Sequence, residues 1–380
     1  MSPARRLLAL ALLPVLLLLS GCGPLYAERR EVEQLRVMEV LGLDAASGGV
    51  LLSLSGPALD GEEQSAFFAD AVGASLADAL ARLQERSAEE TIFCGHLQHL
   101  LVGEEAARAG LEPLLTAVCR SSDLRPDLPL YLILGGSAKD ALSQVGGAGI
   151  DIADALQAAE TGREHQRLSS ARGILLDLDR QGCALVRALR LQEQDSGAGE
   201  RVQRLAPAGY GVLVDGQLRE LIGPEEALGA ELLVDGLRPC ALALSSPDGR
   251  SATLELEESR LQLVPAWDGD DELTALELRV WVRAVVQELD SSRPLSEDRL
   301  SALLEAEIAG RVGAVLQRAR DLEADFLGLG RRIERLAPLR GRGLDRDLGP
   351  LLPGLTLRIS VQGELSHSND LKQGGGDGST

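Results

Sequence analysis

The residues that indicate the clearest chemistry are Leu19-Ser20-Gly21-Cys22, near the start of the chain. They follow two arginines, Arg5 and Arg6, and the apolar run Leu7–Leu19, which has the length of the hydrophobic part of a secretory signal. Small residues directly before a cysteine form a lipobox, in which the thiol is alkylated with diacylglycerol and a peptidase cuts before it. We therefore expect residues 1–21 to be a lipoprotein signal peptide and Cys22 to be lipidated. An ordinary signal peptide that contains a cysteine is the alternative, but the lipobox fits at every position.

The expected lipid at Cys22 decides how the chain meets a membrane. The apolar run before it is shorter than the ~20 residues that a transmembrane helix needs, and no later segment has ~18 consecutive apolar residues. The acyl chains on Cys22 are therefore the expected attachment to membrane lipid, on the outer face, with each buried methylene contributing ~0.8 kcal/mol.

The other residues that could bind a metal or form crosslinks are widely spaced. Four further cysteines occur without a C-x-x-C pair, which disfavours a zinc site: Cys94, Cys119, Cys183 and Cys240. Each lies in an apolar stretch, so buried free thiols are favoured over two disulfides, and their pairing stays open. His96 and His99 lie within a predicted strand, where residues three apart point to opposite faces. We expect no metal at this pair.

Motifs for catalysis are absent from the sequence. It has no G-x-S-x-G elbow, no G-x-x-x-x-G-K loop and no H-E-x-x-H pair, and its four histidines fall in no triad setting. We therefore expect neither catalytic residues nor a cofactor. The net charge of −20, or −22 once a signal peptide with two arginines is removed, argues against nucleic acid as a partner and against docking to anionic head groups.

The first half of the chain alternates predicted strands with predicted helices. Residues 35–44 and 50–54 predict a hairpin. Phe68, Val72, Leu76, Ala79 and Leu83 recur every three or four residues, which predicts one helix over 65–86. Further on, the pattern predicts strands over 96–102 and 128–134, a helix over 104–120, and a helix capped by Ser137. Residues 192–203 are polar and small, as in a linker or surface loop.

The second half predicts longer strands and one long helix. Tyr210–Ile222 predicts a hairpin that turns at Asp215-Gly216. Alternating apolar residues over 276–283 predict a strand with one buried face. Apolar spacing from Leu304 to Phe326 predicts a helix of about six turns, preceded by Ser296 as its cap. Additional strands are expected over 240–244, 253–256, 261–264 and 355–362.

These elements predict an α+β fold of several domains, and the length of the chain predicts two or three. It would have a mixed, α/β-like N-terminal part and a C-terminal antiparallel sheet packed with a long helix. The expected division is a signal peptide over 1–21, an N-terminal region over 22–205, a C-terminal domain over 206–371 and a disordered polar tail over 372–380.

Five segments behind the lipobox, in order, resemble the Ger(x)C proteins, the lipoprotein C subunits of nutrient germinant receptors in endospore-forming bacteria. The segments are Glu28–Leu35, Val40–Asp44, Gly95–Leu111 with the following Gly136–Leu142, Gly211–Leu218, and Ala319–Gly330. The last is similar to the family's "Q-x-x-x-x-D-i-f-G-f-G" end of a long helix. The resemblance covers almost the whole chain after Cys22.

The resemblance implies a three-domain α+β fold on the outer surface of the spore's inner membrane. It implies integral-membrane partners, the A and B type receptor subunits, in a complex that responds to small nutrients. It implies no catalytic activity and leaves open whether this chain binds a ligand itself. Acylated Cys22, for example with palmitate, would hold the chain beside these partners.

A substrate-binding lipoprotein of an ABC transporter is the alternative function. Such proteins usually have two similar α/β lobes, whereas the second half of this chain predicts antiparallel strands and a single long helix. An enzyme at the cell surface is the third hypothesis and is less favoured than the other two.

Overall fold

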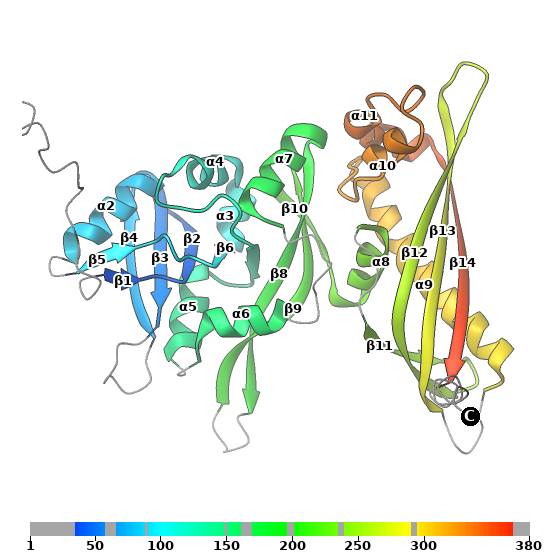
Figure 1. The fold of residues 1–380 in the computed structure, drawn as a ribbon, viewed down its shortest axis with the longest axis horizontal. Coiled ribbons are helices and arrows are strands. Elements are labelled where there is room, and N and C mark those ends of the chain that lie inside the picture. Colours follow the sequence, from blue (N-terminus) through cyan, green and yellow to red (C-terminus); the bar gives the residue numbers. More distant parts are fainter. Residues whose placement is uncertain are drawn as a thin grey trace, which may run out of the picture.

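The computed structural model shows two parts lying side by side, each built on its own sheet (Figure 1). The described residues are 35–57, 66–87, 90–147, 150–160, 169–195, 201–234, 239–289 and 295–367. We call the described residues up to Ile222 the N-terminal part and those from Pro224 onward the C-terminal part. The mixture of helices with three sheets confirms the predicted α+β class.

The N-terminal part is organised around an eight-stranded sheet with the order β10-β9-β8-β7-β6-β2-β3-β4. Its strands are β2 (Val40–Ala46), β3 (Gly49–Gly56), β4 (Phe67–Gly73), β6 (His99–Gly103), β7 (Leu130–Leu134), β8 (Cys183–Asp195), β9 (Arg201–Val214) and β10 (Gln217–Ile222). The four central strands β2, β6, β7 and β8 run parallel, and antiparallel strands flank them on both sides. Two short strands, β1 (Leu35–Val37) and β5 (Thr91–Phe93), form a separate parallel pair.

Helices cover both faces of this sheet, so its central strands are apolar on both sides. One face packs against α2 (Leu76–Arg86), α3 (Glu104–Ala109), α4 (Glu112–Arg120) and α7 (Ala171–Gln181). The opposite face packs against α5 (Ala138–Gly147) and α6 (Ile152–Glu160). Along β6, Leu100 and Val102 enter the first core and Leu101 enters the second, as the alternation of a strand requires.

Two predicted helices of the N-terminal part are wrong in extent. The helix expected over 65–86 begins only at Leu76, because residues 67–73 form β4, the edge strand beside β3. The helix expected over 104–120 is two helices. Gly110 interrupts it with φ +129°, and the N–H of Leu111 donates to the carbonyl oxygen of Gly216 at 2.8 Å instead of continuing the helix. Pro113 then lies in the first turn of α4, where a proline is tolerated.

The C-terminal part combines a four-stranded sheet of order β11-β12-β13-β14 with the long helix α9 (Figure 1). Its elements are α8 (Pro224–Val234), β11 (Cys240–Ser245), β12 (Ser251–Trp267), β13 (Leu273–Leu289), α9 (Glu297–Asp321), α10 (Leu329–Leu336), α11 (Leu344–Leu351), a 3-10 turn (Leu352–Gly354) and β14 (Thr356–His367). The predicted turn at Asp215-Gly216, the predicted burial of Leu278 in β13 and the long helix are confirmed.

The expectation of a wholly antiparallel C-terminal sheet is wrong at one pair, because β14 runs parallel to β13. Parallel neighbours need a crossover connection, and α9 lies between these two strands in the sequence. The long helix also ends earlier than expected, at Asp321, so that Phe326 lies in the segment after it. Ser296 precedes α9, but its side chain makes no capping hydrogen bond.

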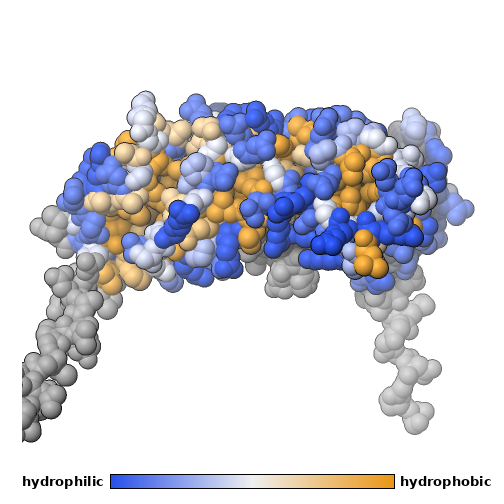
Figure 2. All heavy atoms as spheres, turned by 90° about the horizontal axis from the view of Figure 1, so that it is seen from above, coloured by the Kyte–Doolittle hydropathy of each residue, from blue (hydrophilic) through white to orange (hydrophobic). Residues whose placement is uncertain are grey.

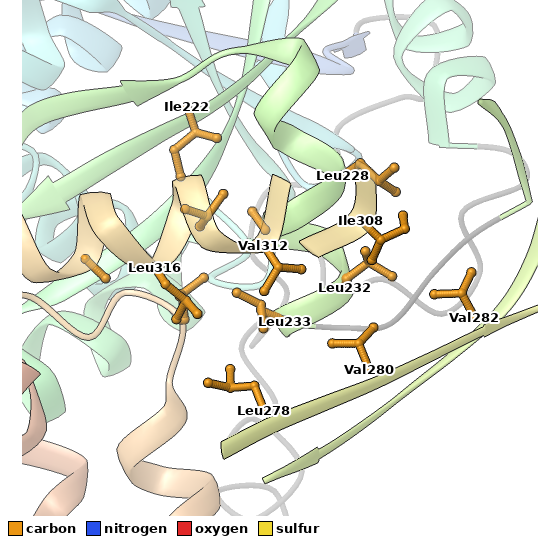
Figure 3. Close-up of a cluster of buried hydrophobic side chains, with 14 of the residues drawn as sticks. Ile222, Leu228, Leu232, Leu233, Leu278, Val280, Val282, Ile308, Val312 and Leu316 are labelled. Carbon is orange, nitrogen blue, oxygen red and sulfur yellow. The ribbon is translucent and has the colours of Figure 1, made fainter. Parts of the chain in front are cut away.

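One apolar core joins the two parts. Residues of α8, α9 and β13 meet in it (Figure 3), and it extends to Cys183 of β8, Tyr210 and Val212 of β9 and Ile222 of β10. Helix α8 crosses α9 closely, since a Cβ on Gly229 would lie 2.3 Å from the carbonyl oxygen of Arg311. The junction between the parts is therefore packed, with α8 as the element that bridges them.

The expected division at residues 205 and 206 falls inside β9, which pairs along its length with β8. Most of the polar stretch 192–203, expected as a linker or loop, belongs to these two strands; residues 196–200 lie outside the described ones. The sheet of the N-terminal part continues to Ile222. The domain boundaries themselves stay predictions.

Candidate functional site

The residue with the strongest sequence-based assignment lies outside the described residues. Cys22, the expected signal peptide over 1–21 and the expected tail over 372–380 all fall in segments that the structure does not describe. Lipidation of Cys22 therefore stays a prediction. Among the residues that the structure does describe, no helix combines the length and the apolar composition needed to cross a membrane.

The carboxyl ends of the parallel strands, where α/β proteins commonly bind ligands, carry a set of internal hydrogen bonds. The carboxylate of Asp44, at the end of β2, accepts from the backbone N–H groups of Ala138 and Lys139 at 2.7 and 2.9 Å. It thereby caps the start of α5, and burial raises its pKa despite these two donors. A Cβ on Gly103 would lie 2.0 Å from Asp44 Oδ1, so only glycine fits beside this carboxylate. Asp44 and Gly103 thus have a structural role.

Asp325 builds a second internal cap, at the start of α10. It is fully buried, and its Oδ1 and Oδ2 accept from the N–H groups of Leu329 and Gly330 at 2.9 and 2.7 Å. Burial raises the pKa of Asp325 to about 7, against the lowering effect of these donors. Gly328 begins the turn with φ +67°, a conformation that glycine adopts readily. The Asp-x-x-Gly-x-Gly pattern at the end of the long helix therefore encodes this turn.

The four cysteines outside the lipobox are free thiols in the structure, as favoured from their apolar surroundings. Burial raises the pKa of Cys94 to about 12 and that of Cys240 to about 11, so these thiols stay protonated at neutral pH. Cys183 is also buried, and burial raises its pKa. None has the lowered pKa of a reactive cysteine.

The two histidines of the predicted strand lie in different surroundings. His96 lies in an exposed turn and His99 begins β6, so the strand expected over 96–102 starts three residues later than predicted. Burial lowers the pKa of His99 to about 4, which keeps its ring neutral, and the ring lies 6.1 Å from that of Tyr131. Within the described ranges, no group of three or more His, Cys, Asp or Glu side chains is arranged to hold a metal ion.

The junction between the two parts carries ion pairs around its apolar core. Asp177 of α7 contacts Arg331 of α10 at 3.5 Å, and Glu220 of β10 contacts Arg318 of α9 at 3.3 Å. Tyr210 of β9 donates its hydroxyl hydrogen to Glu231 of α8 at 2.9 Å. These contacts fix the C-terminal part against the sheet of the N-terminal part.

A cavity of about 360 Å³ lies at this junction, between β8 and β9 on one side and α8 and β11 on the other. Its wall includes Arg187, Tyr210 and Glu231 together with apolar side chains such as Leu228. This size falls in the range of small-molecule sites, roughly 300–1,000 Å³. It is one of several hollows among the described residues, and no expectation from the sequence pointed to it. Arg187 within the apolar stretch from Cys183 to Leu189 was the available signal, since arginines are rarely buried.

Several large apolar side chains of the C-terminal helices and of α7 are exposed. Leu176 of α7 and Leu336, Leu339 and Leu351 around α10 and α11 are exposed, Leu339 almost completely. These helices lie along the upper side of Figure 1, which Figure 2 views face-on and which shows hydrophobic patches among hydrophilic ones. Exposed leucines occur on most protein surfaces and by themselves assign no partner to this face.

Comparisons with known proteins show which proteins this chain resembles in sequence and in fold. Residues 28–170 match the family model described as the spore germination protein N-terminal domain. A solved structure described as the crystal structure of the GerBC protein shares the fold, with a TM-score of 0.53 and 14% sequence identity, over 86% of this chain and 96% of that one. Over residues 28–170 the chain therefore carries a spore germination protein N-terminal domain, in agreement with the resemblance to the Ger(x)C proteins. No curated protein matches its sequence.

The match over residues 28–170 supports the resemblance drawn from the sequence segments that lie within this range. The structure adds what two of the five segments do, because Asp44 and Asp325 are buried caps that position α5 and α10. The absence of an enzymatic role, the lipid on Cys22 and the partner subunits stay predictions for this protein.

Proposed function

We propose that this protein is a lipid-anchored subunit of a spore nutrient germinant receptor, which acts with integral-membrane A and B type subunits in nutrient-triggered germination. The observation that carries the proposal is the match of residues 28–170 to the spore germination domain, supported by a fold that extends over 86% of the chain. The proposed location is the outer surface of the spore's inner membrane.

The position of Cys22 suits an anchor close to the folded body. The first described strand begins at Leu35, so the 12 residues 23–34 separate it from the predicted lipid. A chain of this length spans at most about 40 Å when fully extended. The body would therefore stay within one protein diameter of the bilayer, where it can contact subunits embedded in it.

The test of the anchor is Cys22→Ala. We expect the variant to leave the membrane fraction of dormant spores, because lipidation requires the thiol. Cys119→Ala is the matched control, since Cys119 is a free, half-buried thiol in the folded body, and it should stay in the membrane fraction. Retention of the Cys22→Ala protein at the level of the unchanged chain would contradict lipid anchoring.

The test of the receptor role is deletion of the gene in a strain without a paralogue. Nutrient-triggered germination should be lost and restored by the unchanged chain, while germination by a non-nutrient trigger should persist. Integral-membrane A and B type subunits should co-purify with the chain from detergent extracts of spores. Normal nutrient germination of the deletion strain would refute the proposal.

The transporter alternative finds no support in the fold. Its lipoproteins were expected to have two similar α/β lobes, whereas here an eight-stranded sheet covered by helices on both faces adjoins a four-stranded sheet with one long helix. The two parts differ in strand number, strand order and helix placement.

A further inference from the structure

A groove lies at the end of the N-terminal part that is farthest from the C-terminal part, where α2 and β5 are found (Figure 1). Its walls are formed by α2, by β5 with residues 94 and 95, by the end of α4 with residues 121–123, and by Leu35 of β1. We call it the α2–β5 groove. Its volume of about 1060 Å³ exceeds the usual range of small-molecule sites, roughly 300–1,000 Å³, so it has room for a segment of polypeptide.

The middle of the α2–β5 groove is apolar and reachable from solvent. On α2, Leu80 is half-buried while Ala77 and Ala81 are exposed, and Phe93 of β5 is 43% exposed. The polar residues 120–123 border the groove on the side of α4. An apolar centre with a polar border is the usual composition of a protein–protein interface, in which aromatic residues are enriched.

Side-chain contacts, and not strand pairing, would hold an occupant of this groove. The side-chain oxygen of Gln84 accepts from the backbone N–H of Ile92 at 3.0 Å, and its amide donates to the carbonyl oxygen of Glu90 at 3.2 Å. The backbone groups of β5 that face α2 are therefore already bonded, which closes this edge to a further strand. An amphipathic helix that lays its apolar face into an apolar groove needs no free strand edge.

The α2–β5 groove lies beside the point at which the chain enters the folded body. Leu35, the first described residue, lines it. On the proposed function Cys22 carries the lipid, and the 12 residues 23–34 span at most about 40 Å. The groove is therefore held within reach of segments that receptor subunits present at the outer face of the membrane.

Shape and charge disfavour two other occupants of the groove. Contact with a bilayer buries an apolar face that projects from the protein, whereas this site is hollow, and the net charge of −20 is repelled by anionic head groups. Two copies of the chain related by a two-fold axis would place groove against groove and leave both unfilled.

We propose that the α2–β5 groove binds an amphipathic helix of an integral-membrane receptor subunit. This inference rests on the proposed function, because only an anchored chain meets such a subunit at the membrane, and it adds the surface that makes the contact. The proposed function can hold while this inference fails, since an anchored chain could contact the same subunits through another surface.

The test compares the amounts of A and B type subunits that co-purify with the full-length chain from detergent extracts of spores. Ala77→Glu adds a carboxylate at an exposed position in the first turn of α2, where an acidic residue suits the helix. A bound helix would bury this charge without a partner, so the recovered subunits should fall roughly tenfold or more, while the variant stays in the membrane fraction. Ala302→Glu, exposed on α9, is the matched control and should recover the subunits as the unchanged chain does.

A photoreactive crosslink identifies the occupant even if Ala77→Glu misfolds. Benzoylphenylalanine in place of Ser122, an exposed residue at the border of the groove, should crosslink to an A or B type subunit in spore membranes. Full recovery of the subunits with Ala77→Glu would overturn the proposal, as would crosslinks only to lipid, to residues 23–34 of the same chain, to a second copy or to nothing. If the subunits do not co-purify even with the unchanged chain, the proposed function fails and the groove proposal fails with it.

Discussion

Asp325 offers the sharpest test of how the structure is held together. Its two carboxylate oxygens accept buried N–H groups from Leu329 and Gly330 at 2.9 and 2.7 Å, and no solvent reaches them. Asp325→Ala would leave both donors unsatisfied. Each buried donor without a partner costs roughly 1–3 kcal/mol, so the free energy of unfolding should fall by roughly 2–6 kcal/mol. Asp325→Asn keeps one acceptor but turns an amide N–H₂ toward the second donor, and should lose roughly 1–3 kcal/mol.

The same residue predicts a dependence of stability on pH. Burial raises the pKa of Asp325 from 3.8 to about 7, so between these values the folded chain binds a proton that the unfolded chain has released. Stability from this group is therefore present below about pH 4 and is lost as the pH rises to about 7. The shift sets an upper limit of roughly 4 kcal/mol on the loss. Asp325→Asn has no titrating group there and should lack this component.

The assay is urea unfolding from pH 4 to pH 8, followed by the fluorescence of Trp267 and Trp281, which lie in β12 and β13. The difference in unfolding free energy between the unchanged chain and Asp325→Asn should shrink as the pH rises from 4 to 7. Asp321→Asn, an exposed position at the end of α9, is the matched control and should show a constant difference. A difference for Asp325→Asn that stays constant or grows over this range would refute the reasoning.

Two other substitutions test the remaining supports of the fold, both by urea unfolding. Asp44→Ala removes the acceptor for the two N–H groups at the start of α5 and should cost roughly 2–4 kcal/mol, whereas Asp140→Ala, exposed on the first turn of the same helix, should cost less than 1 kcal/mol. Similar losses in both would contradict the capping role. Ile308→Ala truncates a fully buried side chain in the core beside α8 and should cost roughly 2–5 kcal/mol, and Ile308→Val about 1 kcal/mol; equal effects would show that the site is not close-packed.

Local sequence patterns correctly predicted the elements whose residues carry the whole structural requirement within one short segment. The turn at Asp215-Gly216 needs two positive φ angles, and both are observed, at +50° and +74°. The alternation around Leu278 requires one buried face, which β13 shows. The spacing that includes Ile308 belongs to a helix long enough for its period to be unambiguous.

The predictions that failed depended on contacts between distant segments. Phe68 and Val72 fit the period of the following helix, but β4 forms because β3 offers an edge for pairing. The break at Gly110 lets Leu111 bond the distant turn at Gly216. Likewise, β14 lies parallel to β13 because α9 returns the chain to the end of the sheet at which β13 begins. No local pattern in the sequence specifies whether two strands pair parallel or antiparallel.

The functional residues show the same contrast between what local sequence patterns predict and what contacts between distant segments decide. The sequence alone gave the expected lipid on Cys22, the resemblance to a family of germination proteins and the class of fold, because a lipobox, ordered motifs and apolar periods are all local in the chain. Only the tertiary structure decided that two motif residues, Asp44 and Asp325, are buried caps, and that Arg187 is buried at the junction of the two parts. Burial and pairing arise between segments that are far apart in sequence. A pattern of residues can place a charge on a strand, but what covers that charge depends on how the two parts pack.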